Sequence, residues 1–424
     1  MTTCHYPLPT QPIKRESSRC GFSLVELLVA STIAMSVMAA VATLFGTFGG
    51  TASDAQSIVD MTNRMRMTAS RLRRDLAGVT APLRPPLSPD ANLGYFELIE
   101  GPLVDATANA ASSLLADVDD VLLFTTQSAG SPFQGRFVVA GIDRQIESST
   151  AEVAWFCRPS PATAQTVAGL NLHTLYRRQL LVEGYVGAAP FHAPPSPATN
   201  QIAGTIPDLF NLYDVSLRAV GGGVFVPNTL GDLTLRENRF LHGAWNVRFS
   251  GTTPGTTFDA ASGREGEDVV LSNVISFDVR VFDPDIFVRS LSGTILYPGD
   301  PDYTTAANTT ARGAFIDLGR QGGVTVLSGS AASKAGAGLE CTYDTWSTAY
   351  EANGVGEDAD SLVDEGTNGV DDSSPADGLP DDPGETETSP PYSTPLTAIE
   401  VRVRCYDPVS QQVRQTTIRH AFAN

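Results

Sequence analysis

Residues 22–48 form an apolar run that contains a single charged residue, Glu26. As a helix that rises about 1.5 Å per residue, this run would be roughly 40 Å long, enough to cross the roughly 30 Å core of a bilayer. Lys14, Arg15 and Arg19 precede it, and basic residues favour the cytoplasmic side of a membrane. An ordinary secretory signal has a shorter apolar region that ends at a small-residue cleavage site. The run therefore predicts one membrane-spanning helix, with the rest of the chain on the outer side.

The start of this run reads GFSLVE, residues 21–26, and it follows the polar leader, residues 1–21. The stretch resembles the prepilin signal of type IV pilins and type II secretion pseudopilins. The resemblance implies that a prepilin peptidase cuts after Gly21 and methylates the new amino terminus of Phe22. It also implies that residues 22–49 anchor the subunit in bacterial inner-membrane lipid, with a periplasmic C-terminal domain, until it joins other pilin or pseudopilin subunits in a filament. The alternative is an ordinary signal-anchor helix.

By the same resemblance, Glu26 matches the acid at the fifth position of mature pilins. A carboxylate at membrane depth costs roughly 2.5 kcal/mol or more unless it is paired. In the filaments of this family, the acid is thought to face the amino terminus of a neighbouring subunit. Because pairing offsets the cost only when subunits are in register, we expect Glu26 to act in assembly. The alternative is a glutamate near the headgroups with no specific role.

The helix is predicted to continue as an amphipathic segment over residues 50–79. Its apolar residues recur at steps of three, four or seven, which is typical of one helix face: Ile58, Met61, Met65, Leu72, Leu76 and Val79. Arginines occupy much of the remaining surface, namely Arg64, Arg66, Arg71, Arg73 and Arg74. They form either a solvated face or a surface that meets carboxylates of neighbouring subunits. Gly78 and the proline-rich stretch after it end the helix.

Residues 80–424 read as a β-rich domain. Strands are predicted over 119–128, 135–142, 151–157, 174–182, 245–250, 273–283, 397–407 and 413–422. The last two are close enough in sequence for an antiparallel hairpin, and Ile399, Val401, Val403 and Cys405 alternate onto one face. We expect an α+β fold in which the long N-terminal helix packs on an antiparallel β-rich domain with long loop insertions. This order resembles the J-type pseudopilins and W-type minor pilins.

The acidic insertion, residues 353–388, carries 12 acids between Glu357 and Glu387 and no lysine or arginine. Oxygen ligands at alternating positions suit Ca²⁺, and the spacing resembles Asp-rich calcium repeats such as those of thrombospondin type 3 and dockerins. The candidate ligands are Asp358, Asp360, Asp364, Glu365, Asp377, Asp381 and Asp382. Leu362 stands where such a loop needs an oxygen, and the alternative is a disordered, solvated loop. Apart from this calcium ion, the sequence predicts no cofactor.

Composition and motifs narrow the function. The formal net charge of −19 disfavours nucleic acid as a partner, because phosphate binding needs clustered lysine and arginine. The chain has no G-x-S-x-G, H-E-x-x-H, S-x-x-K or P-loop motif, so we expect no enzymatic activity. The predicted function is a minor pilin or pseudopilin, a non-enzymatic structural subunit. The alternatives are a calcium-binding tip pilin with an adhesive role and a membrane-anchored periplasmic enzyme.

The cysteines leave two alternatives open. None of the five lies in a C-x-x-C motif, which disfavours a thiol-rich zinc site or a thioredoxin-like motif. Removal of the leader leaves Cys157, Cys341 and Cys405. A disulfide between Cys341 and Cys405 and a set of buried free thiols both fit this pattern.

Overall fold

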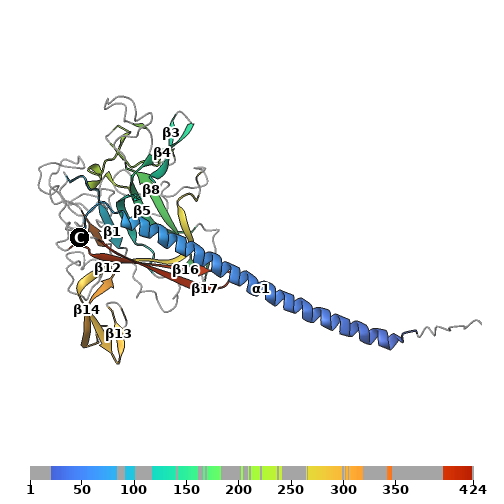
Figure 1. The fold of residues 1–424 in the computed structure, drawn as a ribbon. Helices are drawn as coiled ribbons and strands as arrows, with labels where there is room; N and C mark the ends of the chain where they lie inside the picture. The colour runs from blue at the N-terminus through green and yellow to red at the C-terminus, as the bar shows by residue number, and fades with distance from the viewer. Residues whose placement is uncertain are drawn as a thin grey trace, which may run out of the picture. The chain divides into compact units, whose positions relative to one another are not determined.

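The fold is α+β, with one long N-terminal helix and an antiparallel β-rich domain (Figure 1). The chain divides into two compact units, Met1–Gln56 and Ser57–Asn424. Helix α1 begins in the first unit and spans Leu24–Ala77. The computed structural model describes residues 21–83, 91–100, 117–139, 142–160, 166–167, 170–182, 202–203, 209, 212–219, 222–235, 238–240, 264, 266–297, 300, 302–303, 305–318, 341–345 and 395–422.

The strands all belong to the second unit. They are β1 Phe96–Glu100, β2 Val121–Gln127, β3 Phe133–Val139, β4 Ile142–Ser148, β5 Thr150–Pro159, β6 Thr166–Val167, β7 Leu170–Asn171, β8 His173–Leu181, β9 Ile202–Ala203, β10 Leu217–Ala219, β11 Val224–Pro227, β12 Val269–Leu291, β13 Thr294–Leu296, β14 Asn308–Ile316, β15 Cys341–Asp344, β16 Ala398–Asp407 and β17 Gln412–Ala421. A short 3-10 helix, η4, spans Asp232–Thr234.

One large sheet forms the body of this unit. Its strands follow the order β15-β1-β2-β5-β8-β12-β16-β17, while β13 and β14 also pair with β12. Val274 of β12 pairs with β8 and with β16, and Val281 pairs with β14 and with β16. Strands β8 and β14 therefore share one edge of β12, and β16 takes the other. Between Val274 and Val281, no described strand pairs with the edge that β8 and β14 share.

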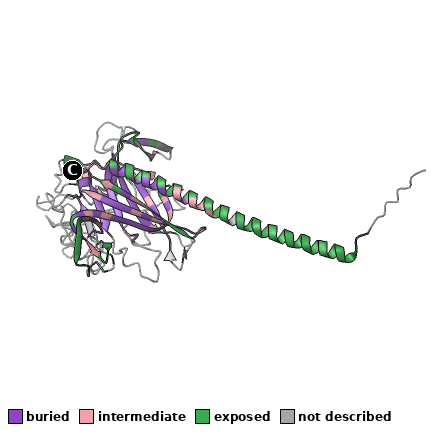
Figure 2. Ribbon diagram, turned by 60° about the horizontal axis from the view of Figure 1, so that its bottom comes forward, coloured by how far each residue is buried: buried purple, intermediate pink, exposed green. Residues whose placement is uncertain are grey.

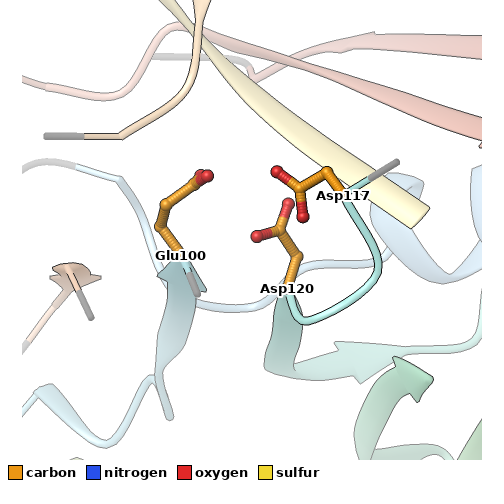
Figure 3. Close-up of side chains that lie close together, drawn as sticks. All are labelled: Glu100, Asp117 and Asp120. Atoms are coloured by element: carbon orange, nitrogen blue, oxygen red, sulfur yellow. The ribbon is translucent and has the colours of Figure 1, made fainter. Parts of the chain in front are cut away.

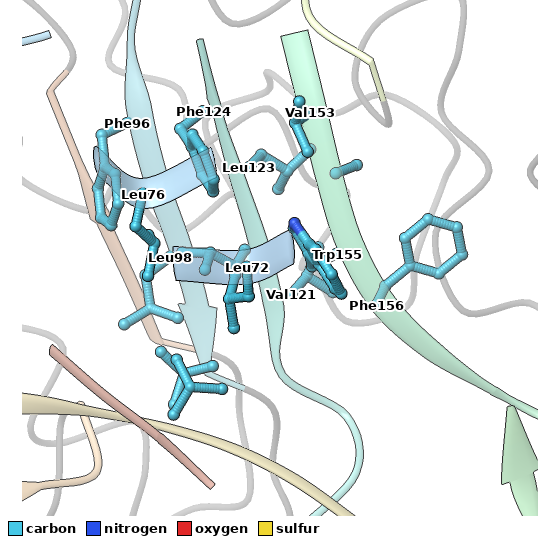
Figure 4. Packing of buried hydrophobic residues seen from close by; sticks show 14 of the residues in the cluster. Leu72, Leu76, Phe96, Leu98, Val121, Leu123, Phe124, Val153, Trp155 and Phe156 are labelled. Carbon is cyan, nitrogen blue, oxygen red and sulfur yellow. The ribbon is translucent and has the colours of Figure 1, made fainter. Parts of the chain in front are cut away.

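The last part of α1 packs on this sheet through the predicted apolar face. Met61, Met65, Ala69, Leu72 and Leu76 are buried, and Figure 4 shows Leu72 and Leu76 among apolar side chains of β1, β2 and β5. A fully buried leucine stabilises a fold by about 1.5–3 kcal/mol. The sheet strands are mostly buried, whereas the side chains described over residues 21–48 are exposed (Figure 2).

The sequence predicted much of the large sheet. Strands β2, β5, β8, β16 and β17 lie within two residues of their predicted ends, β3 lies near its own, and β16 and β17 pair as the expected antiparallel hairpin. The face with Ile399, Val401, Val403 and Cys405 is buried, as the alternation predicted. Strand β12 extends beyond the predicted 273–283 at both ends. The strands that were not predicted are β1, β13, β14 and β15 of the large sheet and β4, β6, β7, β9, β10 and β11 of the small sheets. The predicted strand 245–250 lies outside the described residues.

Candidate assembly site

The residues of the predicted processing and assembly motif lie at the start of α1. The backbone N–H of Glu26 donates to Ser23 Oγ at 3.2 Å, and Leu27 N donates to Ser23 O at 3.1 Å. Ser23 is thus the N-cap, and Ser-x-x-Glu is the pattern of a capping box. An acid in the first turn also interacts favourably with the helix dipole. The side chains of Phe22 and Glu26 are exposed, and an added Cβ at Gly21 would meet no other atom within 4 Å.

The apolar side chains from Phe22 to Phe48 are all exposed. Phe22 and Leu24 are 79% and 81% exposed, and Leu44, Phe45 and Phe48 remain more than half exposed. Among the described residues, α1 is the one helix long and apolar enough to cross a membrane, and the mean hydropathy of its most apolar window is 2.1. Soluble proteins bury side chains of this kind. This segment therefore requires lipid, or apolar surface from other subunits, around it.

The other end of α1 is fixed to the sheet by a buried acid, Asp75. Arg177 of β8 donates two hydrogen bonds to its carboxylate, from Nε to Oδ2 at 2.6 Å and from Nη2 to Oδ1 at 2.8 Å. Trp155 of β5 donates its indole N–H to Oδ2 at 3.0 Å. All three residues are at least 96% buried. A bidentate arginine–carboxylate pair fixes geometry as well as charge, so this triad sets how the last turn of α1 meets β5 and β8.

Backbone contacts complete the attachment just after α1. Gln127 N donates to Gly78 O at 2.7 Å, Thr80 N donates to Thr125 O at 3.0 Å, and Val79 forms a β-bridge with Thr126. A side chain at Gly78 would collide with Gln127 O and Thr126 Oγ1. The glycine is therefore needed for the close approach of two backbones, in addition to ending the helix.

The arginines of the amphipathic segment lie on the surface. Arg64, Arg66, Arg71, Arg73 and Arg74 are exposed, which agrees with a solvated face. Three of them, Arg64, Arg71 and Arg74, line a groove of about 1000 Å³ that also includes Arg177 and part of β3. Partial burial and the nearby Arg177 lower the pKa of Arg71 to about 10, so the groove still carries positive charge at neutral pH. Contact with carboxylates of neighbouring subunits stays a prediction.

Several predicted site residues lie outside the described part of the chain. The leader up to Cys20 and the whole acidic insertion, with Asp358, Asp360, Asp364, Glu365, Asp377, Asp381 and Asp382, belong to this group. Calcium binding by the insertion therefore stays a prediction. Asp75 was missed because it stands in the Arg-rich stretch RLRRDL, which reads as a solvated face. Its signal was its position beside Leu72 and Leu76 on the apolar stripe.

The two cysteines whose side chains the structure describes, Cys157 and Cys405, are buried free thiols. Cys405 is a free, buried thiol whose Sγ donates to Ser272 O at 3.2 Å, so the structure does not join it to Cys341 and the predicted disulfide is not formed. The side chain of Cys341 is outside the described residues. Burial, with a further contribution from Asp407, raises the pKa of Cys405 to about 12. Cys157 is also free and buried, and neither thiol has the lowered pKa of a reactive cysteine.

Comparison with known proteins places the motif in a family. Residues 17–42 match the family model described as the prokaryotic N-terminal methylation motif. No curated protein and no solved structure matches the chain significantly. The matched range contains Gly21, Phe22, Glu26 and the first turns of α1. The motif and the exposed apolar helix together support a pilin-like or pseudopilin-like subunit that a prepilin peptidase processes and that assembles with other pilins.

Proposed function

We propose that the chain is a minor pilin or pseudopilin, a non-enzymatic subunit of a type IV pilus or of a type II secretion pseudopilus. Prepilin peptidase cuts it after Gly21 and methylates the amino group of Phe22. The observation that carries the proposal is the Gly21-Phe22 pair and Glu26 at the capped start of α1, whose apolar side chains are exposed as far as Phe48.

The exposed apolar part of α1 and its sheet-bound part have separate roles before and after the subunit enters a filament. Before assembly, the exposed apolar side chains between Leu24 and Phe48 lie in the inner membrane, with the second unit in the periplasm. After assembly, the same side chains pack against helices of neighbouring subunits, which replace lipid as apolar surroundings. The sheet-bound part of α1 is attached to the β-rich domain through the ion pair between Asp75 and Arg177.

The β-rich domain supports a minor subunit. Helix α1 packs on the large antiparallel sheet, and the domain carries three further small sheets among its described residues. The resemblance of helix and strand order to J-type pseudopilins and W-type minor pilins agrees with a subunit present in few copies near the filament tip. An adhesive role for the acidic insertion would add to this function without replacing it.

The direct test is a mass spectrum of the mature amino terminus. The full chain is expressed in cells with an active prepilin peptidase and, in parallel, in cells without one. We expect a chain that begins at methylated Phe22 in the first case and an uncut chain in the second. Gly21→Leu should remain uncut in both, and open space around Gly21 makes misfolding an improbable cause. An uncut wild-type chain beside an active peptidase would overturn the proposal.

A further inference from the structure

The unpaired stretch of β12 is covered by a short acidic turn just before β2. Phe277 N donates to Asp117 O at 2.8 Å, and Val279 N donates to Asp120 Oδ2 at 2.6 Å. The turn thus satisfies donors that a strand would otherwise bind between β8 and β14. It also brings carboxylates into the interior of the domain, where Asp117 and Asp120 are 1% and 0% exposed.

Glu100, at the end of β1, joins these two acids. The three side chains point toward one another (Figure 3), and one oxygen from each lies within 4.8 Å of the others. Two oxygens bound to one Ca²⁺ at roughly 2.4 Å can lie at most about 4.8 Å apart. The spacing of the carboxylates is therefore compatible with a shared cation.

Several carboxylate oxygens of Glu100 and Asp117 lack hydrogen-bond partners. Both carboxylate oxygens of Asp117 and Oε1 of Glu100 are buried without a hydrogen-bond partner, while Glu100 Oε2 accepts from Leu318 N at 3.2 Å. Glu100 is 2% exposed. Buried carboxylates without partners are strongly destabilising at neutral pH unless they are protonated or bind a cation.

Other carboxylates near the cluster add to its unbalanced negative charge. Asp278 and Asp317 lie near the cluster. Both form ion pairs with Arg280, whose Nε is 3.0 Å from one carboxylate oxygen of each. Neither Glu100 nor Asp117 forms an ion pair with any residue that the structure describes. Burial first, and then the neighbouring carboxylates, raise the pKa values of Glu100, Asp117 and Asp120 well above the usual range.

We propose that Glu100, Asp117 and Asp120 bind a calcium ion beside the stretch of β12 that pairs with neither β8 nor β14. Ca²⁺ fits better than Mg²⁺, because Mg²⁺ keeps several waters and these ligands are enclosed by protein, with oxygen as the only donor. The ion joins the end of β1, the start of β2 and, through Val279, the middle of β12. Its role is structural, and it depends neither on the acidic insertion nor on the proposed function.

The test measures calcium binding by the full chain in detergent micelles. Protein stripped with a chelator is titrated with CaCl₂ by calorimetry, and its thermal midpoint is followed. We expect saturable binding and, at calcium about 100-fold above the dissociation constant, a rise of about 5 °C in the midpoint. Asp117→Asn keeps side-chain volume but removes a ligand charge, so its affinity should fall tenfold or more. Without calcium its midpoint should rise, which shows that the variant is folded.

Two further variants separate this site from other acids. Asp285→Asn changes an exposed acid on β12 and should bind calcium like the wild type. Asp360→Ala/Asp364→Ala removes candidate ligands of the acidic insertion and should keep the heat that Asp117→Asn loses. The proposal is overturned if the wild type shows no calcium-dependent change, or if Asp117→Asn binds as the wild type does. Equal stabilisation by MgCl₂ at the same concentration would overturn the choice of calcium.

Discussion

Glu26 and Asp75 are acids near opposite ends of the same helix, and they meet very different surroundings. Glu26 lies in the first turn, exposed, and the side chains around it are exposed and apolar. Asp75 lies in the last turn, buried, with Arg177 and Trp155 bound to its carboxylate. Both acids interrupt an apolar surface. Asp75 has its partners within its own chain, whereas the Glu26 carboxylate forms no ion pair with any residue that the structure describes.

The difference teaches how a lone carboxylate on an apolar surface is to be interpreted. Where the fold supplies a cation, the acid fixes tertiary structure, as Asp75 does between α1 and the sheet. Where the fold supplies none, the acid is costly in any apolar surroundings until another molecule brings a positive charge. Under the proposed function, that charge is the methylated amino group of a neighbouring Phe22. The predictions below test this contrast.

The largest effect is expected from Glu26→Leu, which should be cut and methylated normally but be absent from sheared filaments. The folded domain should keep its thermal midpoint, because Glu26 belongs to the first unit and the sheet to the second. Immunoblots of sheared filaments and of membranes measure the two pools. Normal incorporation of Glu26→Leu would refute the assembly role.

Two matched variants decide whether charge or helix capping matters at this position. Glu26→Gln preserves the Ser-x-x-Gln form of the capping box but removes the charge, so it should fail to assemble as Glu26→Leu does. Ser23→Ala removes the hydrogen bond to Glu26 N but keeps the charge, so it should still assemble. The reverse pattern would mean that Glu26 only starts the helix.

Asp75→Ala should cause the second-largest effect, a loss of about 3–5 kcal/mol in the free energy of unfolding. It leaves the Arg177 guanidinium buried without its carboxylate, and removal of one member of a buried pair costs this much. Chemical denaturation of the full chain in detergent measures the loss. The cut after Gly21 should be unaffected, because the motif lies outside the second unit.

The control for this prediction removes both charges. Asp75→Leu/Arg177→Met replaces the pair with apolar side chains and should recover most of the stability, since a buried pair can be exchanged for apolar packing at little cost. A remaining deficit of about 1–3 kcal/mol is expected from Trp155, whose indole N–H loses its acceptor. If the double variant is as unstable as Asp75→Ala, the unpaired charge is not the cause.

The same contrast explains what the sequence could predict. Local patterns sufficed for the apolar run, the buried face of α1 and the β16–β17 hairpin, because each depends on periodicity over a few residues. The predicted strand 273–283 stopped before Pro284, because proline is unfavourable inside a strand, whereas β12 continues to Leu291. In the fold, Pro284 lies within a register shift between Asp283 and Phe287, where a proline is tolerated.

The polar interior could not be predicted from local sequence. Asp75 meets Arg177 about a hundred residues later, and Asp117 lies against the stretch of β12 that β8 and β14 leave unpaired. Before the sheet is known, both acids read as surface residues. By contrast, Gly21, Phe22 and Glu26 were recognisable because their motif is a short local sequence pattern, which can be identified without knowledge of the tertiary structure.

Ser57→Ala should have the smallest effect and tests where the sheet-bound part of α1 begins. Ser57 Oγ donates to Asp407 Oδ2 at 2.5 Å, and Ser410 Oγ donates to the same oxygen at 2.6 Å. Burial opposes ionisation of Asp407, but the hydrogen bonds from Ser410 and Ser57 outweigh it and lower its pKa. Because this hydrogen bond to a charged acceptor is only partly buried, we expect a loss of about 1 kcal/mol at pH 7.

The pH dependence of this loss follows from the lowered pKa of Asp407. The carboxylate stabilises the folded state above the unfolded pKa of about 3.9, and this contribution disappears as the pH falls through the lower folded pKa. The difference between wild type and Ser57→Ala should therefore be full at pH 7 and shrink below about pH 4. Ser410→Ala, which breaks a contact within the β16–β17 turn alone, should share this pH profile. If Ser57→Ala costs the same at pH 3 as at pH 7, the ionised Asp407 does not hold α1 to the hairpin, and the sheet-bound part of the helix begins later, at Met61.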